Sequence, residues 1–216
     1  LIGPNGAGKS TLIAQIAGTL KPDSGSIHFM GQNVTATGSV ARARLGLGRT
    51  FQISALAMDF TVLQNVLLGA LGARGGVFRF LRPVLADDEL RAVAFEALER
   101  VGLVDQAAIR CAELSHGQRR QLEVAVALTM KPRAFLMDEP MAGLGAGGSR
   151  RLTGFLDGLR AEAPILMVEH DMDAVFALAD RISVLVYGKI IASGTVREIR
   201  ASAAVRRAYL GDEVAV

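Results

Sequence analysis

The feature that most constrains this chain is a glycine-rich run near its first residue. It matches the pattern G-x-x-x-x-G-K-[ST] and reads Gly3-Pro4-Asn5-Gly6-Ala7-Gly8-Lys9-Ser10. Glycine lets the backbone N–H groups of such a loop turn inward, and the helix that opens near Lys9 adds its positive end. We expect Lys9 to reach the terminal phosphates of a nucleotide, Ser10 to offer a hydroxyl to Mg²⁺, and Thr11 to continue the helix. An ordinary glycine-rich turn is the alternative, and the helical residues after Ser10 disfavour it.

Composition excludes several classes of protein. The 216 residues are 50% hydrophobic, enough for one domain or two closely packed ones and too apolar for a disordered chain. The 24 basic and 21 acidic residues leave a net charge of +3, and the scattered basic residues are not typical of a nucleic-acid-binding protein. The single Cys111 has no disulfide partner and no metal-ligand pattern around it, so we expect a reduced thiol rather than a reactive nucleophile. No apolar run reaches the roughly 18 to 20 residues of a membrane span, so we expect any membrane role to be peripheral.

Strand and helix patterns alternate along much of the chain. Apolar runs at 134–137 and 165–168 each end at a charged residue, as buried parallel strands do, and a helical segment at 149–161 lies between them. A hairpin is expected at 182–192, and a capping box beginning at Thr195 opens a last helix. The pattern predicts an α/β fold with a parallel sheet.

The middle of the chain has mainly helical patterns. Apolar residues recur along one helix face from 87 to 101, and residues 69–83, rich in Gly and Arg, predict a loop. We therefore expect residues 53–131 to form a mainly α-helical subdomain inserted into an α/β core of residues 1–52 and 132–216.

Two acidic residues follow the predicted strand at 134–137. Asp138 and Glu139 stand at the C-terminal edge of that strand, where α/β sheets bind ligands. Neighbouring residues of a strand point to opposite sides, so these two carboxylates are expected to have different tasks. We expect Asp138 to hold Mg²⁺ through its water shell and Glu139 to polarise an attacking water molecule. A pair of solvated acids at a strand end is the alternative.

A second phosphate-binding platform is predicted at the run Leu114-Ser115-His116-Gly117-Gln118. Ser115 and Gln118 fit a capping box, and a helix start with a small hydroxyl and a bare glycine backbone also suits an anion. The run resembles the LSGGQ signature of ATP-binding cassette (ABC) ATPases, and His116 stands at a position where that family tolerates variety.

The resemblance gives two further residues a role. Gln52, in Arg49-Thr50-Phe51-Gln52, resembles the Q-loop that joins the core to the helical subdomain, where an amide ligates Mg²⁺ and the attacking water. His170, in the run 168–172, resembles the switch histidine that contacts the γ-phosphate and holds the water and Glu139 in line. Without the resemblance, surface solvation for the glutamine and a structural role for the histidine would be the simpler interpretations.

One loop departs from the family pattern. After Glu139-Pro140 the family has a D-loop that ends in Asp, or in Asn in some branches, whereas this chain has Ala142-Gly143-Leu144-Gly145. Gly145 has no side chain, so a side-chain bond from this position across a dimer is not expected.

The resemblance covers essentially the whole chain and implies a P-loop NTPase core of the ABC ATPase type. The runs 48–52 and 168–172 and the C-terminal run 208–211 are similar to ATP-binding subunits of high-affinity branched-chain amino-acid importers. The implied cofactors are ATP and Mg²⁺. Two subunits, identical or different, would close head to tail, with ATP between residues 3–11 of one and Ser115, Gly117 and Gln118 of the other.

Partners and location follow from the same resemblance. It implies transmembrane permease subunits, a periplasmic binding protein acting indirectly, no nucleic acid, and a peripheral place on the cytoplasmic face of the bacterial inner membrane. Exposed apolar residues near 53–62 are expected to dock on the membrane partner, with a buried helix face as the alternative.

Other functions remain open at this point. Importers of amides or urea share the same segments. An ABC module that works without a transporter usually carries tandem cassettes or long coiled-coil insertions, and neither fits in this chain. A GTPase would need an Asn-Lys-x-Asp motif, which the sequence lacks.

The start of the chain carries an expectation of its own. Because Leu1 and Ile2 run straight into the glycine-rich loop, we expect a preceding β region, with the aromatic side chain that stacks on adenine in the family, to be missing. These 216 residues alone are then expected to be aggregation-prone and nearly inactive.

Overall fold

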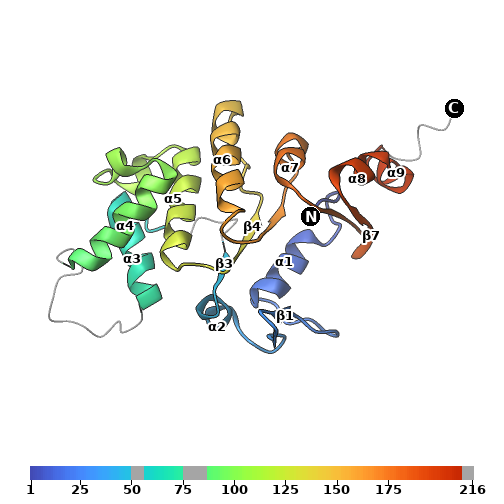
Figure 1. Ribbon diagram of the computed structural model, residues 1–216, viewed down its shortest axis with the longest axis horizontal. Coiled ribbons are helices and arrows are strands. Elements are labelled where there is room, and N and C mark those ends of the chain that lie inside the picture. The colour runs from blue at the N-terminus through green and yellow to red at the C-terminus, as the bar shows by residue number, and fades with distance from the viewer. Residues whose placement is uncertain (50–55, 75–86, 211–216) are drawn as a thin grey trace.

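The computed structural model describes residues 1–49, 56–74 and 87–210, and its architecture is α/β (Figure 1). In chain order the elements are α1 (Lys9–Ala17), β1 (His28–Phe29), β2 (Gln32–Asn33), α2 (Ser39–Arg44), β3 (Leu47–Arg49), α3 (Val62–Arg74), α4 (Asp88–Val101), the 3-10 helices η2 (Val104–Gln106) and η3 (Cys111–Glu113), α5 (His116–Thr129), β4 (Ala134–Asp138), α6 (Ala146–Leu159), β5 (Ile165–Val168), α7 (Met172–Leu178), β6 (Ile182–Val186), β7 (Lys189–Gly194), α8 (Val196–Ala201) and α9 (Ala203–Leu210).

A parallel sheet in the order β3-β4-β5 forms the centre of the molecule. Leu1 and Ile2 lie beside it, because the N–H of Glu169 donates to Leu1 O at 3.4 Å and the N–H of Ile2 donates to Ser183 O at 3.0 Å. These bonds place the first two residues between β5 and β6, and β6 pairs with β7 in an antiparallel hairpin. The glycine-rich loop therefore leaves the sheet at its centre.

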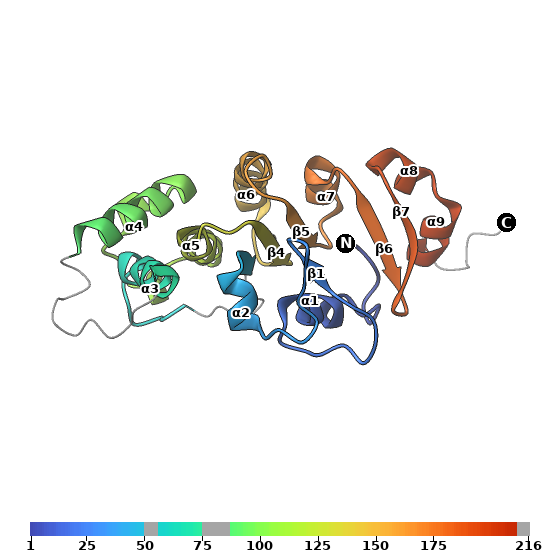
Figure 2. The ribbon, with the colours of Figure 1, turned by 60° about the horizontal axis from the view of Figure 1, so that its bottom comes forward.

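Strand β4 is buried on both faces. Leu136 packs with Ile13 of α1 on one face, while Phe135 and Met137 pack with residues of α6 on the other. Figure 2 shows the same arrangement, with α6 and α7 on one side of the sheet and α1 on the other. Burial on both faces explains why the strand reads as a continuous apolar run.

The predicted elements of this core are confirmed with small shifts. The strands at 134–137 and 165–168 appear as β4 and β5, and α6 between them begins three residues before the predicted helix and ends two residues before its predicted end. The hairpin turns at Tyr187 and Gly188, whose φ values are 46° and 74°, as a two-residue turn of this type requires. Thr195 opens α8 with a complete capping box.

Helices α3, α4 and α5 pack together at one end of the molecule (Figure 1). Helix α4 begins at its N-cap Asp87 and buries the predicted face, including Leu90, Ala94 and Leu98. Cys111 is also buried in this cluster, and burial raises the pKa of its thiol, which agrees with an unreactive cysteine. The subdomain boundary at 52/53 lies outside the described residues and stays a prediction.

The loop predicted over 69–83 is wrong for its first six residues, because α3 continues to Arg74. Gly69 lies where α3 crosses α5, and a Cβ at this position would meet Thr129 Oγ1 at 2.8 Å and Val126 Cγ1 at 2.9 Å. The glycine therefore permits close packing of two helices rather than ending one. Residues 75–83 lie outside the described part of the chain.

Arg42 has a structural role that no pattern in the sequence predicts. Its side chain is 1% exposed, and its guanidinium donates to five backbone carbonyls, those of Gln15, Ile16, Val34, Thr35 and Thr37. Two of these carbonyls belong to the end of α1. The buried cation thus holds the helix that follows the glycine-rich loop against α2.

Among the described residues, no helix combines the length and the apolar character needed to cross a membrane.

Two glycines of α3 provide a matched test of the packing argument. We expect Gly69→Ala to destabilise the protein by about 1–3 kcal/mol, because the added methyl group forces α3 away from α5. Gly72→Ala, in the same helix, meets nothing within 4 Å and should stabilise it by about 0.5–1 kcal/mol. Thermal melting of both variants checks the prediction, and equal shifts in the two would contradict it.

Candidate functional site

The glycine-rich loop is held by the β6–β7 hairpin. A Cβ at Gly3 would lie 2.1 Å from Leu185 O, so only glycine fits against this backbone. The N–H of Gly188, at the hairpin turn, donates to Ala7 O at 2.8 Å. The loop is therefore shaped by contacts from a segment that lies almost the whole chain away in sequence.

The shape of the loop suits an anion. Gly6 and Gly8 have φ values of 77° and 100°, and Gly8 is the N-cap of α1, which has no side-chain cap bond. The N–H groups of the first turn of a helix have no partner within it, and they carry the positive end of the helix dipole. Asn5, Ser10 and Thr11 are exposed beside them, and Pro4 is half-buried.

Lys9 is buried inside this loop. Its Nζ donates to Gly3 O at 2.7 Å and to Pro4 O at 3.0 Å, which leaves one of the three ammonium donors for a ligand. Burial lowers the pKa of Lys9, and the carboxylates of Glu139 and Asp138 partly oppose that change. The ammonium is thus fixed in position, with negative charge close by.

Asp138 ends β4 beside this lysine and is 3% exposed. Burial, followed by repulsion from Glu139, raises the pKa of its carboxyl, while Arg49, Lys9 and Arg120 act in the opposite direction. Its Oδ1 atom is buried and accepts no hydrogen bond from the described residues. A buried carboxylate oxygen with spare acceptor capacity, beside the lysine that precedes Ser10, fits the oxygen ligands that Mg²⁺ prefers.

Glu139 and His170 meet at the ends of two adjacent strands. Glu139 Oε1 lies 3.1 Å from His170 Nε2, and the two side chains are 27% and 44% exposed. Glu139 has a φ of 49°, an uncommon conformation for a residue other than glycine, and its N–H donates to Val168 O at 2.8 Å. The pair is therefore partly open to solvent and can contact a water molecule.

The second predicted platform has its own geometry. Ser115 is the N-cap of α5, and the capping box with Gln118 is complete. Ser115 and His116 are exposed, and Gly117 is half-buried. Figures 1 and 2 show β4 lying between α5, the helix that Ser115 caps, and α1, the helix that the glycine-rich loop opens.

The remaining predicted residues have different outcomes. Gln52 lies outside the described residues, as do residues 53–55 of the expected docking segment. Within the rest of that segment Val62 is buried, while Phe60 is 44% exposed. Gly145 is the N-cap of α6 and makes no side-chain bond there.

Glu169 belongs to this site, although the sequence suggested no task for it. Its side chain is 3% exposed, and its carboxylate accepts from the N–H groups of Met141, His170 and Asp171. The only signal in the sequence is a charge at the end of an apolar strand, directly before His170.

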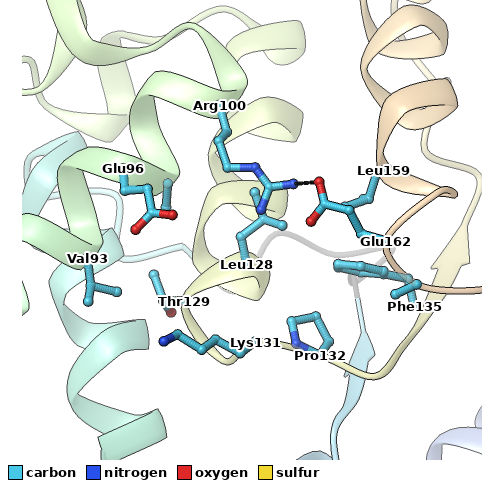
Figure 3. Close-up of a pocket in the computed structure, with 12 residues that line it drawn as sticks. Val93, Glu96, Arg100, Leu128, Thr129, Lys131, Pro132, Phe135, Leu159 and Glu162 are labelled. Carbon is cyan, nitrogen blue, oxygen red and sulfur yellow. Dashed lines mark hydrogen bonds and ion pairs between the residues drawn. The ribbon is translucent and has the colours of Figure 1, made fainter.

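Two cavities among the described residues are lined by no residue of the glycine-rich loop. One of about 220 Å³, between α4, α5 and α6, is bordered by the ion pair of Arg100 and Glu162 at 2.7 Å (Figure 3). Phe135 lines it, so it lies at the end of β4 opposite to Asp138. A second cavity, of about 570 Å³, is lined by Ser115 and Gln118. The larger cavity thus adjoins the second platform, whereas the first contains none of the predicted site residues.

Comparisons with protein families and curated proteins agree on one kind of relative. A family model described as "ABC transporter" matches residues 1–142, and one described as "Branched-chain amino acid ATP-binding cassette transporter" matches residues 189–215. The chain is 36% identical to the high-affinity branched-chain amino acid transport ATP-binding protein LivG of Escherichia coli (strain K12), over 98% of this chain and 86% of that protein. It is 34% identical to the protein BraF of Pseudomonas aeruginosa, which has the same descriptive name, over 98% of this chain and 86% of BraF.

Solved structures give the same result. A nucleotide-free ATP-binding cassette from an ABC transporter superposes with a TM-score of 0.86 at 31% identity, covering 98% of this chain and 87% of that one. The ADP conformation of an ATP-binding cassette gives 0.85 at 32% identity, with coverages of 98% and 86%. A dimeric cassette bound to ADP and Pi gives 0.75 at 25% identity, with coverages of 91% and 84%.

Asp138 generates a prediction about stability. A carboxyl whose pKa is raised by folding opposes folding whenever it is ionised, so the cost is absent at low pH and complete above the raised pKa. Asp138→Asn removes that cost and should raise the melting temperature at pH 8 by roughly 2–4 °C, with a smaller gain as the pH falls toward 4. Asp59→Asn, at an exposed carboxylate, is the control. A lower melting temperature for Asp138→Asn at pH 8 would contradict this account.

Proposed function

This chain belongs to the ABC transporter family of ATP-binding proteins, and we propose that it is the ATP-hydrolysing subunit of an importer for branched-chain amino acids. The observation that carries the proposal is the Glu139–His170 pair at 3.1 Å, beside the loop that holds Lys9. The names of the relatives LivG and BraF, and the family model over residues 189–215, support the cargo class.

The nucleotide would bind first to the loop of residues 3–11. The free N–H groups at the start of α1 and the remaining donor of Lys9 suit the phosphates, because both are already fixed before the ligand arrives. Thr11 is exposed at the first turn and would contact the nucleotide together with Ser10. Asp138, Ser10 and Gln52 would hold Mg²⁺, which supplies charge neutralisation at the phosphates when bound.

Hydrolysis would use the partly exposed pair. Glu139 polarises a water molecule with its carboxylate, and His170 keeps that carboxylate in place while its own ring contacts the γ-phosphate. The proton of the water moves toward Glu139 as the oxygen attacks the γ-phosphorus, and the bond from that phosphorus to the bridging oxygen of ADP breaks, so that ADP and phosphate leave. Asp138 is the buried last residue of β4, whereas Glu139 follows the strand and is partly exposed beside His170, so the two acids would have separate tasks.

A second subunit would complete the site. Strand β4 lies between α5, which begins with this platform, and α1, which the glycine-rich loop opens, so a second copy or a related ABC subunit would supply Ser115, Gly117 and Gln118. Only the closed dimer offers both platforms to one triphosphate, and ATP therefore shifts the population toward closure.

The dimer would work on the cytoplasmic face of a bacterial inner membrane. Opening and closing would be passed to transmembrane permease subunits through the segment after Gln52, where Phe60 offers an exposed apolar contact. A periplasmic binding protein would deliver the amino acid from the other side.

The catalytic assignment is tested by Glu139→Gln. We expect ATP hydrolysis to fall by about 100-fold, because the amide is a poor base, while nucleotide binding is retained. The variant should elute as a dimer in the presence of ATP, since the closed state is no longer released. Glu99→Gln, at an exposed carboxylate of α4, should hydrolyse ATP at the parent rate. Hydrolysis by Glu139→Gln at the parent rate would refute the role.

The cargo is tested by uptake of radiolabelled leucine. Cells from which this chain is deleted should lose high-affinity uptake and regain it from a plasmid carrying the parent, but not Glu139→Gln. Unchanged leucine uptake together with loss of uptake of amides or urea would replace the proposed cargo and leave the ATPase assignment intact.

A further inference from the structure

Glu169 is a buried carboxylate at a junction of two loops. It follows β5 directly, and its side chain is only 3% exposed. A charge so deeply buried is costly unless strong hydrogen bonds compensate it. Its partners therefore indicate what the residue is for.

The two oxygens of Glu169 bind different segments. Oε1 accepts from the N–H of Met141, in the loop after β4, at 2.6 Å. Oε2 accepts from the N–H groups of His170 at 2.8 Å and Asp171 at 3.2 Å, at the start of α7. Charge-assisted bonds of this kind are short and hold their donors firmly. One side chain thus joins the segment that follows Glu139 to the backbone of His170.

The neighbouring contacts extend this link in both directions. On one side Asp171 caps α7 through the N–H groups of Asp173 and Ala174 and accepts from Ser149 Oγ of α6 at 3.1 Å. On the other side, Leu144 lies in the loop after β4, and its Cδ2 is 3.3 Å from the place of a Cβ on Gly117. The second phosphate platform therefore touches the loop that Glu169 holds.

We propose that Glu169 is a positioning residue that keeps Glu139 and His170 in register and passes displacement of the second platform to His170. The route runs from Gly117 through Leu144 and Met141 to the carboxylate, and from there to the His170 backbone. The proposal rests on the proposed function, because it takes the Glu139–His170 pair as the hydrolytic centre. Gly145 has no side chain that could bind a partner subunit. The route through Leu144 and Met141 therefore couples the loop after β4 to the second platform within one chain.

Two substitutions of Glu169 disturb its hydrogen bonds to the two loops in different ways. Gln has the length of Glu but places an NH₂ group against N–H donors on one side, so Glu169→Gln loses one end of the junction. Asp is one methylene shorter, so Glu169→Asp cannot reach both loops. The amide resonances of Met141, His170 and Asp171 report these losses directly in NMR spectra of nucleotide-free protein, without any need for hydrolysis.

The kinetic test is a double-mutant cycle with His170→Ala. We expect Glu169→Gln to lower kcat for ATP about 10- to 100-fold with KM within about twofold of the parent, since it disturbs geometry rather than nucleotide binding. In the His170→Ala background the same change should alter kcat by less than about twofold, because a residue that acts through His170 has nothing left to position. Glu99→Gln is the control in both backgrounds.

Several results would overturn the proposal. An equal loss of kcat with and without His170, a parent-like kcat in Glu169→Gln, or failure of both Glu169 variants to fold would each assign Glu169 a role other than positioning. Parent-like hydrolysis by Glu139→Gln would instead remove the proposed function, while the three amide shifts would still test the junction itself.

Discussion

The site depends on the burial of β4 between two layers of helices. Leu136 is committed to the α1 face and Phe135 and Met137 to the α6 face, so a shift of one residue would turn every apolar side chain to the wrong side. This register delivers Asp138 and Glu139 to the edge of the sheet beside Lys9. The chemistry at that edge is therefore set by hydrophobic packing in the interior.

The charges at this edge are arranged for a ligand rather than for stability. Lys9 and Asp138 are both buried, and burial moves both of their pKa values toward the neutral form. Within the described part of the chain each also has unused bonding capacity, one ammonium donor on Lys9 and one carboxylate oxygen on Asp138. A phosphate with its metal ion matches both groups at once, which is the usual exchange of stability for function at such sites.

Local signals made much of the fold predictable, and long-range contacts account for the rest. Short patterns of neighbouring residues predict the glycine-rich loop, the two parallel strands and the capping boxes. The loop prediction failed at Gly69, because a glycine that permits helix packing looks the same in sequence as one that ends a helix. Glu169 and Arg42 could not be foreseen, since each binds backbone atoms that only folding brings near, the N–H of Met141 for Glu169 and the carbonyls of Gln15 and Ile16 for Arg42. Among the candidate site residues, the structure brings Glu139 to His170, whereas β4 lies between α1, which the glycine-rich loop opens, and α5, which Ser115 caps.

The capping box at the start of α5 keeps the Ser115 hydroxyl hydrogen-bonded within the chain. Ser115 Oγ donates to Gln118 Oε1 at 2.9 Å and accepts from the Gln118 N–H at 3.3 Å, so its hydroxyl proton is already engaged. A phosphate that approaches this platform alone must break one bond to gain another, which yields little net free energy. With the proposed function, stray inorganic anions would therefore be poor competitors, and the hydroxyl would become available only to a ligand that is held from elsewhere at the same time.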